Sequence, residues 1–159
     1  MNEHANLITK FYTAFQQKDW QTMQSCYHAE VIFNDPVFTD LKGKAAKAMW
    51  HMLAVNAKKF SLIFSDIISH DQKGSCHWEA TYSFSKTGRQ VINKIDASFD
   101  FKDGLIYRHN DHFNFWKWTR MALGASGVLL GWSSFLRNKV RSTAMEGLRK
   151  FIAENADYQ

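Results

Sequence analysis

The sequence predicts an α+β fold, in which helices come first along the chain and a strongly curved, mostly antiparallel sheet follows. Two observations carry this prediction. Apolar residues in the first third recur at the three- and four-residue spacing of amphipathic helices. From residue 60 onward they alternate with polar residues, and the turn sequences DQKG, KTG and KDG separate the strands. Short turns of this kind join antiparallel neighbours.

Three helices are expected before the sheet, over residues 5–18, 19–28 and 44–57, with one strand over residues 31–38. The first helix has one apolar stripe, and Asp19 is placed to cap the second. The later strands are expected over residues 60–69, 75–85, 89–102 and 105–116. These strands would form a meander with one wet face, and the helices would cover the other face.

The composition is that of one globular domain with an aromatic interior. The chain has 159 residues, of which 45% are hydrophobic and 22% are charged, and this suits a single core. Thirteen Phe and six Trp can build a dense core or the wide walls of a ligand cavity. Because the N-terminal residues lack the pattern of a signal peptide and no apolar run has the length of a membrane span, we expect a cytoplasmic protein.

Sequence motifs for metals, nucleotides and covalent nucleophiles are absent. The chain has no HExxH motif, no Gly-rich phosphate loop and no GxSxG elbow. Cys26 and Cys76 lie far apart without zinc-site spacing, and we interpret both as reduced packing residues. We therefore expect a protein that uses no metal and no cofactor.

The net charge of +5 is concentrated near the C-terminal end. Residues 1–116 hold 13 Lys and Arg against 12 Asp and Glu, whereas residues 117–159 hold 7 against 3. This distribution argues against nucleic-acid binding by the whole domain. Residues 133–154 have the pattern of an amphipathic helix with a basic outer face. We expect this extension to pack on the same domain or on a partner subunit; contact with an anionic membrane is the alternative.

The last expected strand, LIYRHNDHFNFW, places an ionisable pair on an aromatic face. The side chains that share this face by period two are Tyr107, His109, Asp111, Phe113 and Phe115. A buried carboxylate is costly without a partner, and His109 is the nearest candidate for Asp111. The pair is either a satisfied polar contact in the core or a general acid/base in an apolar pocket.

A second carboxylate stands in the stretch VIFNDPVF, directly before the only proline of the chain. Asp35 has the same parity as Val31 and Phe33, so it faces inward if the strand continues, and Pro36 ends the ladder. Asn34 would then face outward. Asp35 is either a turn residue that binds local backbone or a carboxylate that points into the cavity.

The order helix, helix, VIFNDPVF, LKGK helix, meander and RHNDHFNFW resembles the nuclear transport factor 2-like superfamily, and within it the SnoaL-like proteins. The resemblance covers roughly residues 5–116. It implies a cone-shaped domain over residues 1–116, a C-terminal helical extension over residues 117–159, an apolar pocket and a homodimer. The superfamily includes ketosteroid isomerases, limonene epoxide hydrolases, dehydratases and polyketide cyclases, and also members without catalysis, so the fold alone does not give a function.

Two of these enzyme types match the sequence in part. Ketosteroid isomerases carry their proton-shuttling Asp before a proline, as Asp35 stands here, but their oxyanion Tyr falls at Phe11, beside Tyr12. Their oxyanion Asp falls near Asp96 or Ala97, and the strand alternation points Ala97 inward. Limonene epoxide hydrolases carry an Asp where Asp111 stands and a water-binding Asn where Asn34 stands, whereas their Arg-x-Asp pair matches only Lys94-x-Asp96.

SnoaL-type cyclases use one acid/base Asp on the last strand, and Asp111 with His109 resembles that arrangement best. The sequence therefore predicts acid/base chemistry on a small apolar molecule, with Asp111 as acid/base, His109 as its tuning partner and Asp35 as second carboxylate. The alternative is a non-catalytic module for ligand binding or dimerisation. The residues expected to line the pocket are Phe11, Tyr12, Phe15, Phe33, Trp50, Trp78, Tyr82, Ala97, Phe99, Tyr107 and Phe113.

Overall fold

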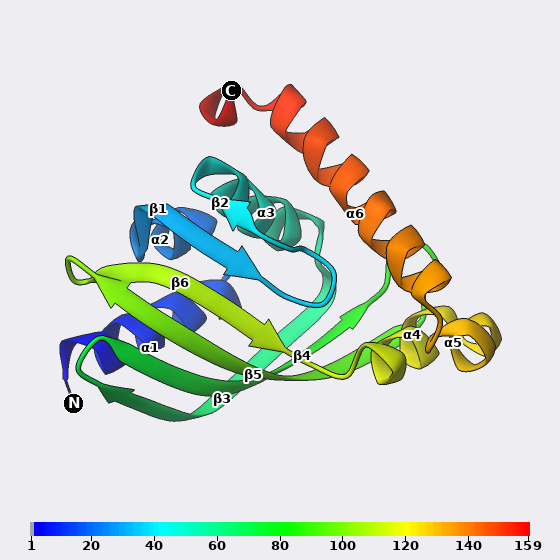
Figure 1. Ribbon diagram of the computed structural model, residues 1–159, viewed down its shortest axis with the longest axis horizontal. Helices are drawn as coiled ribbons and strands as arrows, with labels where there is room; N and C mark the ends of the chain where they lie inside the picture. The colour runs from blue at the N-terminus through cyan, green and yellow to red at the C-terminus, as the bar shows by residue number, and fades with distance from the viewer. Residues whose placement is uncertain (1) are drawn as a thin grey trace.

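The computed structural model describes residues 2–159, and Figure 1 shows a curved sheet that wraps around the N-terminal helices. Three helices belong to the first third: α1 (Glu3–Gln16), α2 (Trp20–Ser25) and α3 (Lys44–Asn56). The expected α+β class and the three helices are confirmed, with the first helix two residues nearer the N-terminus and the second ending at Ser25. The strand expected over residues 31–38 lies four residues earlier, so Asp35 follows its end. Asp19 caps α2 as predicted, because its side chain accepts a hydrogen bond from Thr22 N at 3.0 Å.

Six strands form one sheet in the order β2-β1-β6-β5-β4-β3. Their bounds are β1 (Tyr27–Asn34), β2 (Leu41–Lys42), β3 (Lys58–His70), β4 (Lys73–Ser83), β5 (Gln90–Lys102) and β6 (Leu105–His112). The last four form the predicted antiparallel meander, and β1 pairs with β6 in parallel. This parallel pairing places the stretch around Asp35 beside the end of β6, although 76 residues separate Asp35 from Asp111 in the sequence.

Breaks in strand register let the sheet bend. The pairing shifts between Ser65 and Ile68 on β3 and between Asp100 and Phe101 on β5. Along β5, every second residue from Val91 to Phe101 is buried on the inner face, as the alternation predicts. The inner face packs against α1 and α3 in one aromatic core.

The chain after β6 differs from the expected strand. We predicted a strand to residue 116, but β6 ends at His112 and helix α4 (Phe115–Leu123) follows. Asn114 caps this helix, because its side chain accepts a hydrogen bond from Lys117 N at 3.0 Å. Phe115, expected on the inner strand face, is therefore the first helical residue and packs with Val91 and Trp118 in a second cluster.

Helices α5 (Ala125–Leu130) and α6 (Ser134–Glu154) and the short η1 (Ala156–Tyr158) complete the chain. The amphipathic helix predicted over residues 133–154 is confirmed as α6, which packs on α3 along its C-terminal half (Figure 1). Arg141 departs from its predicted outward position, because it turns toward the loop after β1 and its Nε donates a hydrogen bond to Pro36 O at 2.9 Å. Within residues 2–159, no helix has the length and apolar character to cross a membrane.

Candidate acid/base pocket

An apolar cavity of about 540 Å³ lies between the inner face of the sheet, helix α3 and helix α6. This volume falls within the range of small-molecule sites. Two carboxylates, Asp35 and Asp111, line the same cavity. Most other lining residues are aromatic or aliphatic, and among them are Phe15, Phe33, Phe38, Trp50, Met52, Phe60, Trp78, Tyr82, Ile95 and Phe113.

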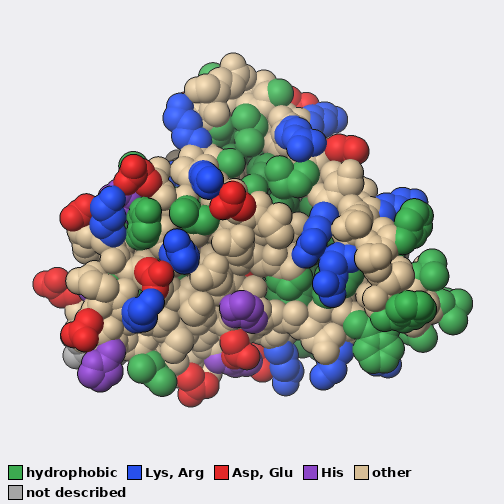
Figure 2. All heavy atoms as spheres, in the orientation of Figure 1, with side chains coloured by type: hydrophobic (Ala, Val, Ile, Leu, Met, Phe, Trp, Pro, Cys, Tyr) green, Lys and Arg blue, Asp and Glu red, His purple; other side chains and the backbone are tan. Residues whose placement is uncertain are grey.

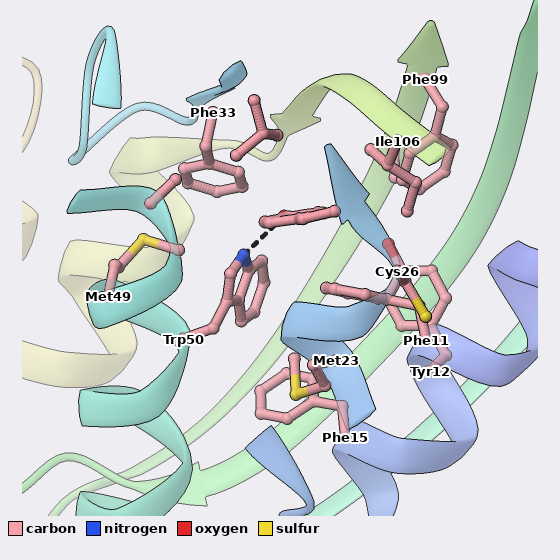
Figure 3. Packing of buried hydrophobic residues seen from close by; sticks show 14 of the residues in the cluster. Phe11, Tyr12, Phe15, Met23, Cys26, Phe33, Met49, Trp50, Phe99 and Ile106 are labelled. Carbon is pink, nitrogen blue, oxygen red and sulfur yellow. Dashed lines mark hydrogen bonds between the residues drawn. The ribbon is translucent and has the colours of Figure 1, made fainter. Parts of the chain in front are cut away.

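A chain of hydrogen bonds behind the cavity wall ends on Asp111. Trp50 Nε1 donates to Tyr27 Oη at 2.6 Å, which Figure 3 shows as a dashed line from the indole. The Tyr27 hydroxyl lies 2.7 Å from His109 Nδ1, and His109 Nε2 lies 2.9 Å from Asp111 Oδ1. Trp78 Nε1 also donates to Asp111 Oδ1, at 3.3 Å. Both His109 and Asp111 are buried, at 0% and 4% exposure.

The chemistry of these groups fixes the direction of the chain. An indole N–H can only donate, so the Tyr27 oxygen accepts from Trp50 and its own hydrogen is free to donate to His109 Nδ1. When His109 Nδ1 accepts in this way, the ring carries its hydrogen on Nε2 and donates it to the Asp111 carboxylate. Burial, and next the nearby charge of Asp111, raise the pKa of Tyr27 well above its usual value, so this hydroxyl keeps its hydrogen.

Asp35 lines the same cavity immediately after β1, one residue beyond the Asn34–Asn110 pair, so it lies beside Asp111 across the β1–β6 pairing. Its Oδ1 accepts hydrogen bonds from Val37 N and Phe38 N, both at 2.6 Å, and these bonds form a local turn around Pro36. Burial raises the pKa of the Asp35 carboxyl to about 7, and the negative charge of Asp111 adds to this rise. The two backbone donors and the positive charge of Arg141 act in the opposite direction.

Both sequence interpretations of Asp35 therefore describe one side chain, which forms the turn and also lines the cavity. In each carboxylate the hydrogen bonds present among residues 2–159 end on Oδ1, at Asp35 from backbone amides and at Asp111 from His109 and Trp78. Neither Oδ2 accepts a bond within this part of the chain, and neither is fully buried. One oxygen of each carboxylate is thus anchored while the other is free for a ligand.

Ten of the eleven residues expected around the pocket fall into two groups. Six line the cavity: Phe15, Phe33, Trp50, Trp78, Tyr82 and Phe113. Four others are packed in the core beside it: Phe11, Tyr12, Ala97 and Phe99. His109 also lies behind the wall and reaches the cavity only through Asp111. The side chain of Tyr12 is notable because its buried hydroxyl has no hydrogen-bond partner in residues 2–159.

Tyr107 is a correction to the expected pocket wall. The register shift opposite the start of β6 buries Ile106 on the inner face, so Tyr107 points outward. There it packs edge-on against His28, and Lys102 lies over its ring at 5.1 Å. A strict period of two through this strand misses a shift of one residue, which reverses every side chain before it.

Sequence reasoning did not single out two further parts of the wall. Asn93 is buried at 7% exposure among the apolar residues of β5, and its parity with Val91 and Ile95 is a signal for its position. Helix α6 supplies one side of the cavity through Leu136, Lys139, Val140, Thr143, Ala144 and Gly147. The apolar stripe of α6 shows that one face is covered, but only the tertiary structure shows that this face meets a cavity.

Metal-ligand groupings are also absent from the described chain: among residues 2–159, no three His, Cys, Asp or Glu side chains lie together as a metal site. The site thus offers two carboxylates in an apolar chamber, one held by the His109 imidazole and one with a pKa of about 7. Such a pair can remove a proton and supply another.

Comparison with known structures agrees with this architecture. A nuclear transport factor 2-like protein of unknown function from Burkholderia pseudomallei is 15% identical, with a TM-score of 0.67 over 76% of this chain and 98% of its own. An LEH-like epoxide hydrolase from Mycobacterium tuberculosis is 15% identical, with a TM-score of 0.65 over 80% and 96%. A candidate polyketide cyclase from Xanthomonas campestris pv. campestris is 20% identical, with a TM-score of 0.62 over 75% and 96%.

Identities this low show that the fold is shared, and they carry no information about a shared chemistry. No curated protein matches the sequence. The model of the SnoaL-like domain, however, matches residues 8–109, which is well over half of the chain and includes β1, the meander and His109. The chain therefore belongs to the SnoaL-like family, within the nuclear transport factor 2-like fold.

Proposed function

We propose that this chain is an enzyme that transfers protons on a small apolar molecule without a cofactor. The observation that carries this proposal is the presence of both Asp35 and Asp111 on one apolar cavity. Asp111 acts as the base through its free Oδ2, while His109 and Trp78 hold Oδ1. Asp35, with a pKa of about 7, is partly protonated at neutral pH and acts as the acid.

The proton balance of such a reaction is simple. Asp111 removes a proton from a carbon next to a carbonyl group, and the electron pair moves onto the carbonyl oxygen. Protonated Asp35 donates its hydrogen to that oxygen, or to another carbon of the same conjugated system. His109 is a positioning residue in this scheme, because it orients Asp111 and stabilises its carboxylate without contacting the ligand.

Proton transfer fits this site better than epoxide opening. The only match to the Arg-x-Asp pair of limonene epoxide hydrolases is Lys94-x-Asp96, and these side chains are 68% and 81% exposed on the outer face of the sheet. The geometry also lacks the oxyanion donors of a steroid-type isomerase, since Phe11 and Ala97 stand at those positions and the Tyr12 hydroxyl does not line the cavity. Isomerisation or ring closure of a ketone needs only the acid and the base.

Deuterium exchange tests the proposal without knowledge of the natural substrate. A panel of cyclic ketones and 1,3-diketones is incubated with the protein in D2O, and deuterium uptake next to the carbonyl is followed by NMR. We expect the wild type to accelerate uptake for at least one compound. Asp111→Asn should lose about a hundredfold or more of that acceleration, as removal of a general base does.

The matched control is Asp96→Asn, which changes an exposed carboxylate on the outer face of the same sheet. It should exchange like the wild type, and thermal unfolding should show that both variants remain folded. Wild-type exchange rates for Asp111→Asn would contradict the assignment of the base. If no compound exchanges faster with the wild type than without protein, the proposal in this form is wrong.

A second candidate function is ligand binding without catalysis. It is favoured by the hydrogen bonds that both carboxylates already make, because the turn at Asp35 and the chain at Asp111 would be needed for stability alone. In that case Asp35→Asn and Asp111→Asn should destabilise the fold together, and ligands should bind in the cavity with no exchange.

A further inference from the structure

Helix α5 is built with a small inner face and a large apolar outer face. Gly127 is buried against α4, where an added Cβ would lie 2.0 Å from Thr119 O. The neighbouring residues Val128, Leu129 and Leu130 are exposed. A helix on a protein surface normally buries its large apolar residues and exposes its polar ones. The close glycine contact keeps the backbones of α4 and α5 together and leaves the large side chains outside.

The exposed apolar surface continues beyond α5. We call the set Val128, Leu129, Leu130, Trp132 and Phe135 the α5 patch. Leu129, Trp132 and Phe135 are 69%, 76% and 70% exposed, the highest values for large apolar side chains in residues 2–159. Figure 2 shows hydrophobic side chains gathered at this end of the molecule. A continuous apolar surface of this kind on a soluble domain marks a binding surface.

A basic groove lies beside the α5 patch. It is lined by Arg89, Lys94, Lys117 and Arg120 together with Val128 of the patch, and no carboxylate lines it, although Lys94 Nζ lies 3.4 Å from Glu79 Oε1 outside the groove. Arg89 is held there by a hydrogen bond from its Nε to Met121 O at 2.9 Å. Between Asp111 and Glu146 the chain has five Lys and Arg and no Asp or Glu. The groove can therefore receive anionic groups next to an apolar surface.

We propose that the α5 patch inserts into the interface of an anionic phospholipid bilayer, with the groove cations on the lipid phosphates. An apolar tip with Trp and a rim of Lys and Arg is the combination that binds this interface. The basic outer face of α6, which the sequence suggested for membrane contact, has fewer apolar side chains to offer, because Leu136 and Val140 line the cavity.

Two other occupants fit the α5 patch less well. Trp132 and Phe135 offer stacking surface to a nucleic acid, but Val128, Leu129 and Leu130 are aliphatic, and a bilayer interface accommodates all five side chains. A second copy of the chain related by a two-fold axis would bring one cationic groove toward the other, and like charges at an interface oppose association. Anionic lipid satisfies both the apolar surface and the charge.

Vesicle co-sedimentation tests the proposal on the full chain. We expect binding to vesicles of phosphatidylglycerol and phosphatidylcholine in equal parts, weakened by salt, and little binding to phosphatidylcholine alone. The triple variant Leu129→Ser, Trp132→Ser, Phe135→Ser should bind at least about tenfold more weakly. Lys117→Gln with Arg120→Gln should weaken binding by about fivefold for each charge removed.

The matched control is Ile63→Ser with Ile68→Ser, which removes apolar side chains that are 66% and 61% exposed on β3. This control should bind vesicles like the wild type. Equal binding by the triple variant, or no binding of the wild type to anionic vesicles, would overturn the proposal. Displacement of the protein from vesicles by a short RNA would indicate a nucleic-acid surface. If the wild type does not bind vesicles and the triple variant forms a smaller oligomer than the wild type, the patch is the interface with a second copy.

Discussion

The two carboxylates of the cavity are held in different ways. Asp111 is fixed by side chains from β4 and β6, and a chain of hydrogen bonds runs back to Trp50. Asp35 is fixed by the backbone amides of its own turn and lies beside α6. Burial is the main cause of the raised pKa of the Asp35 carboxyl. Four predictions test this difference.

The largest effect is expected around Asp111, from His109→Leu. This change leaves the buried Asp111 carboxylate and the Tyr27 hydroxyl without their shared partner. We expect a loss of about 3 to 5 kcal/mol in the free energy of unfolding, measured with urea. His112→Leu is the control, because His112 is exposed on the outer face of the same strand. Equal losses from both changes would contradict a role for the chain of hydrogen bonds.

Two tyrosines allow a sharper test of the hydrogen bonds that lead to Asp111. Tyr27→Phe removes a hydroxyl that joins Trp50 and His109, and should cost about 1 to 3 kcal/mol because two buried groups lose their partner. Tyr12→Phe removes a buried hydroxyl that has no partner in residues 2–159, and should be neutral or stabilising. If urea unfolding shows Tyr12→Phe to be the more harmful change, the hydrogen-bond assignment is wrong.

At Asp35 we expect the stability of the fold to depend on pH. The folded-state pKa of Asp35 is raised from 3.8 to about 7, so the folded protein binds this proton more tightly than the unfolded chain. Stability therefore falls as the pH rises from about 4 to about 7. Relative to Asp35→Asn, the wild type should lose about 1 to 2 kcal/mol across this window, because solvent partly screens a half-buried carboxyl. Parallel stability curves for the two proteins would refute the burial of Asp35.

The smallest effect is expected from Arg141→Met. The change removes the hydrogen bond to Pro36 O and should cost about 1 kcal/mol or less. It also removes a positive charge that lowers the folded-state pKa of Asp35, so the upper limit of the pH window described above should move upward. Arg149→Met, an exposed position on the same helix, should leave both the stability and the window unchanged.

The sequence predicted most of the fold because the relevant patterns are local. The helical stripe of α1, the cap at Asp19 and the alternation on β5 each depend on neighbours within a few residues. The errors lie where a local pattern changes period. Tyr107 precedes a register shift, and Phe115 follows a cap at Asn114 that ends the extended pattern. Asn114 is itself a helix-start signal that the strand prediction overrode.

The candidate site was predictable only in part. Parity placed Asp111 on the inner face, but the sequence left Asp35 open between a turn and the cavity, because the pairing of β1 with β6 joins segments far apart in the sequence. The position of His109 between Tyr27 and Asp111 depends on how β1, β6 and α3 pack together. The α6 wall depends on contacts between segments far apart in the sequence, so no local pattern could have identified it.

The position of α6 has a consequence for how this protein could be redesigned. The reactive groups come from the sheet and the turn after β1, whereas one wall of the chamber belongs to a helix that packs on α3. Gly147 lines the chamber from that helix, and an added Cβ there would meet nothing within 4 Å. This wall can therefore be altered apart from the reactive groups, and larger side chains at Gly147 would narrow the range of ligands while both carboxylates stay in place.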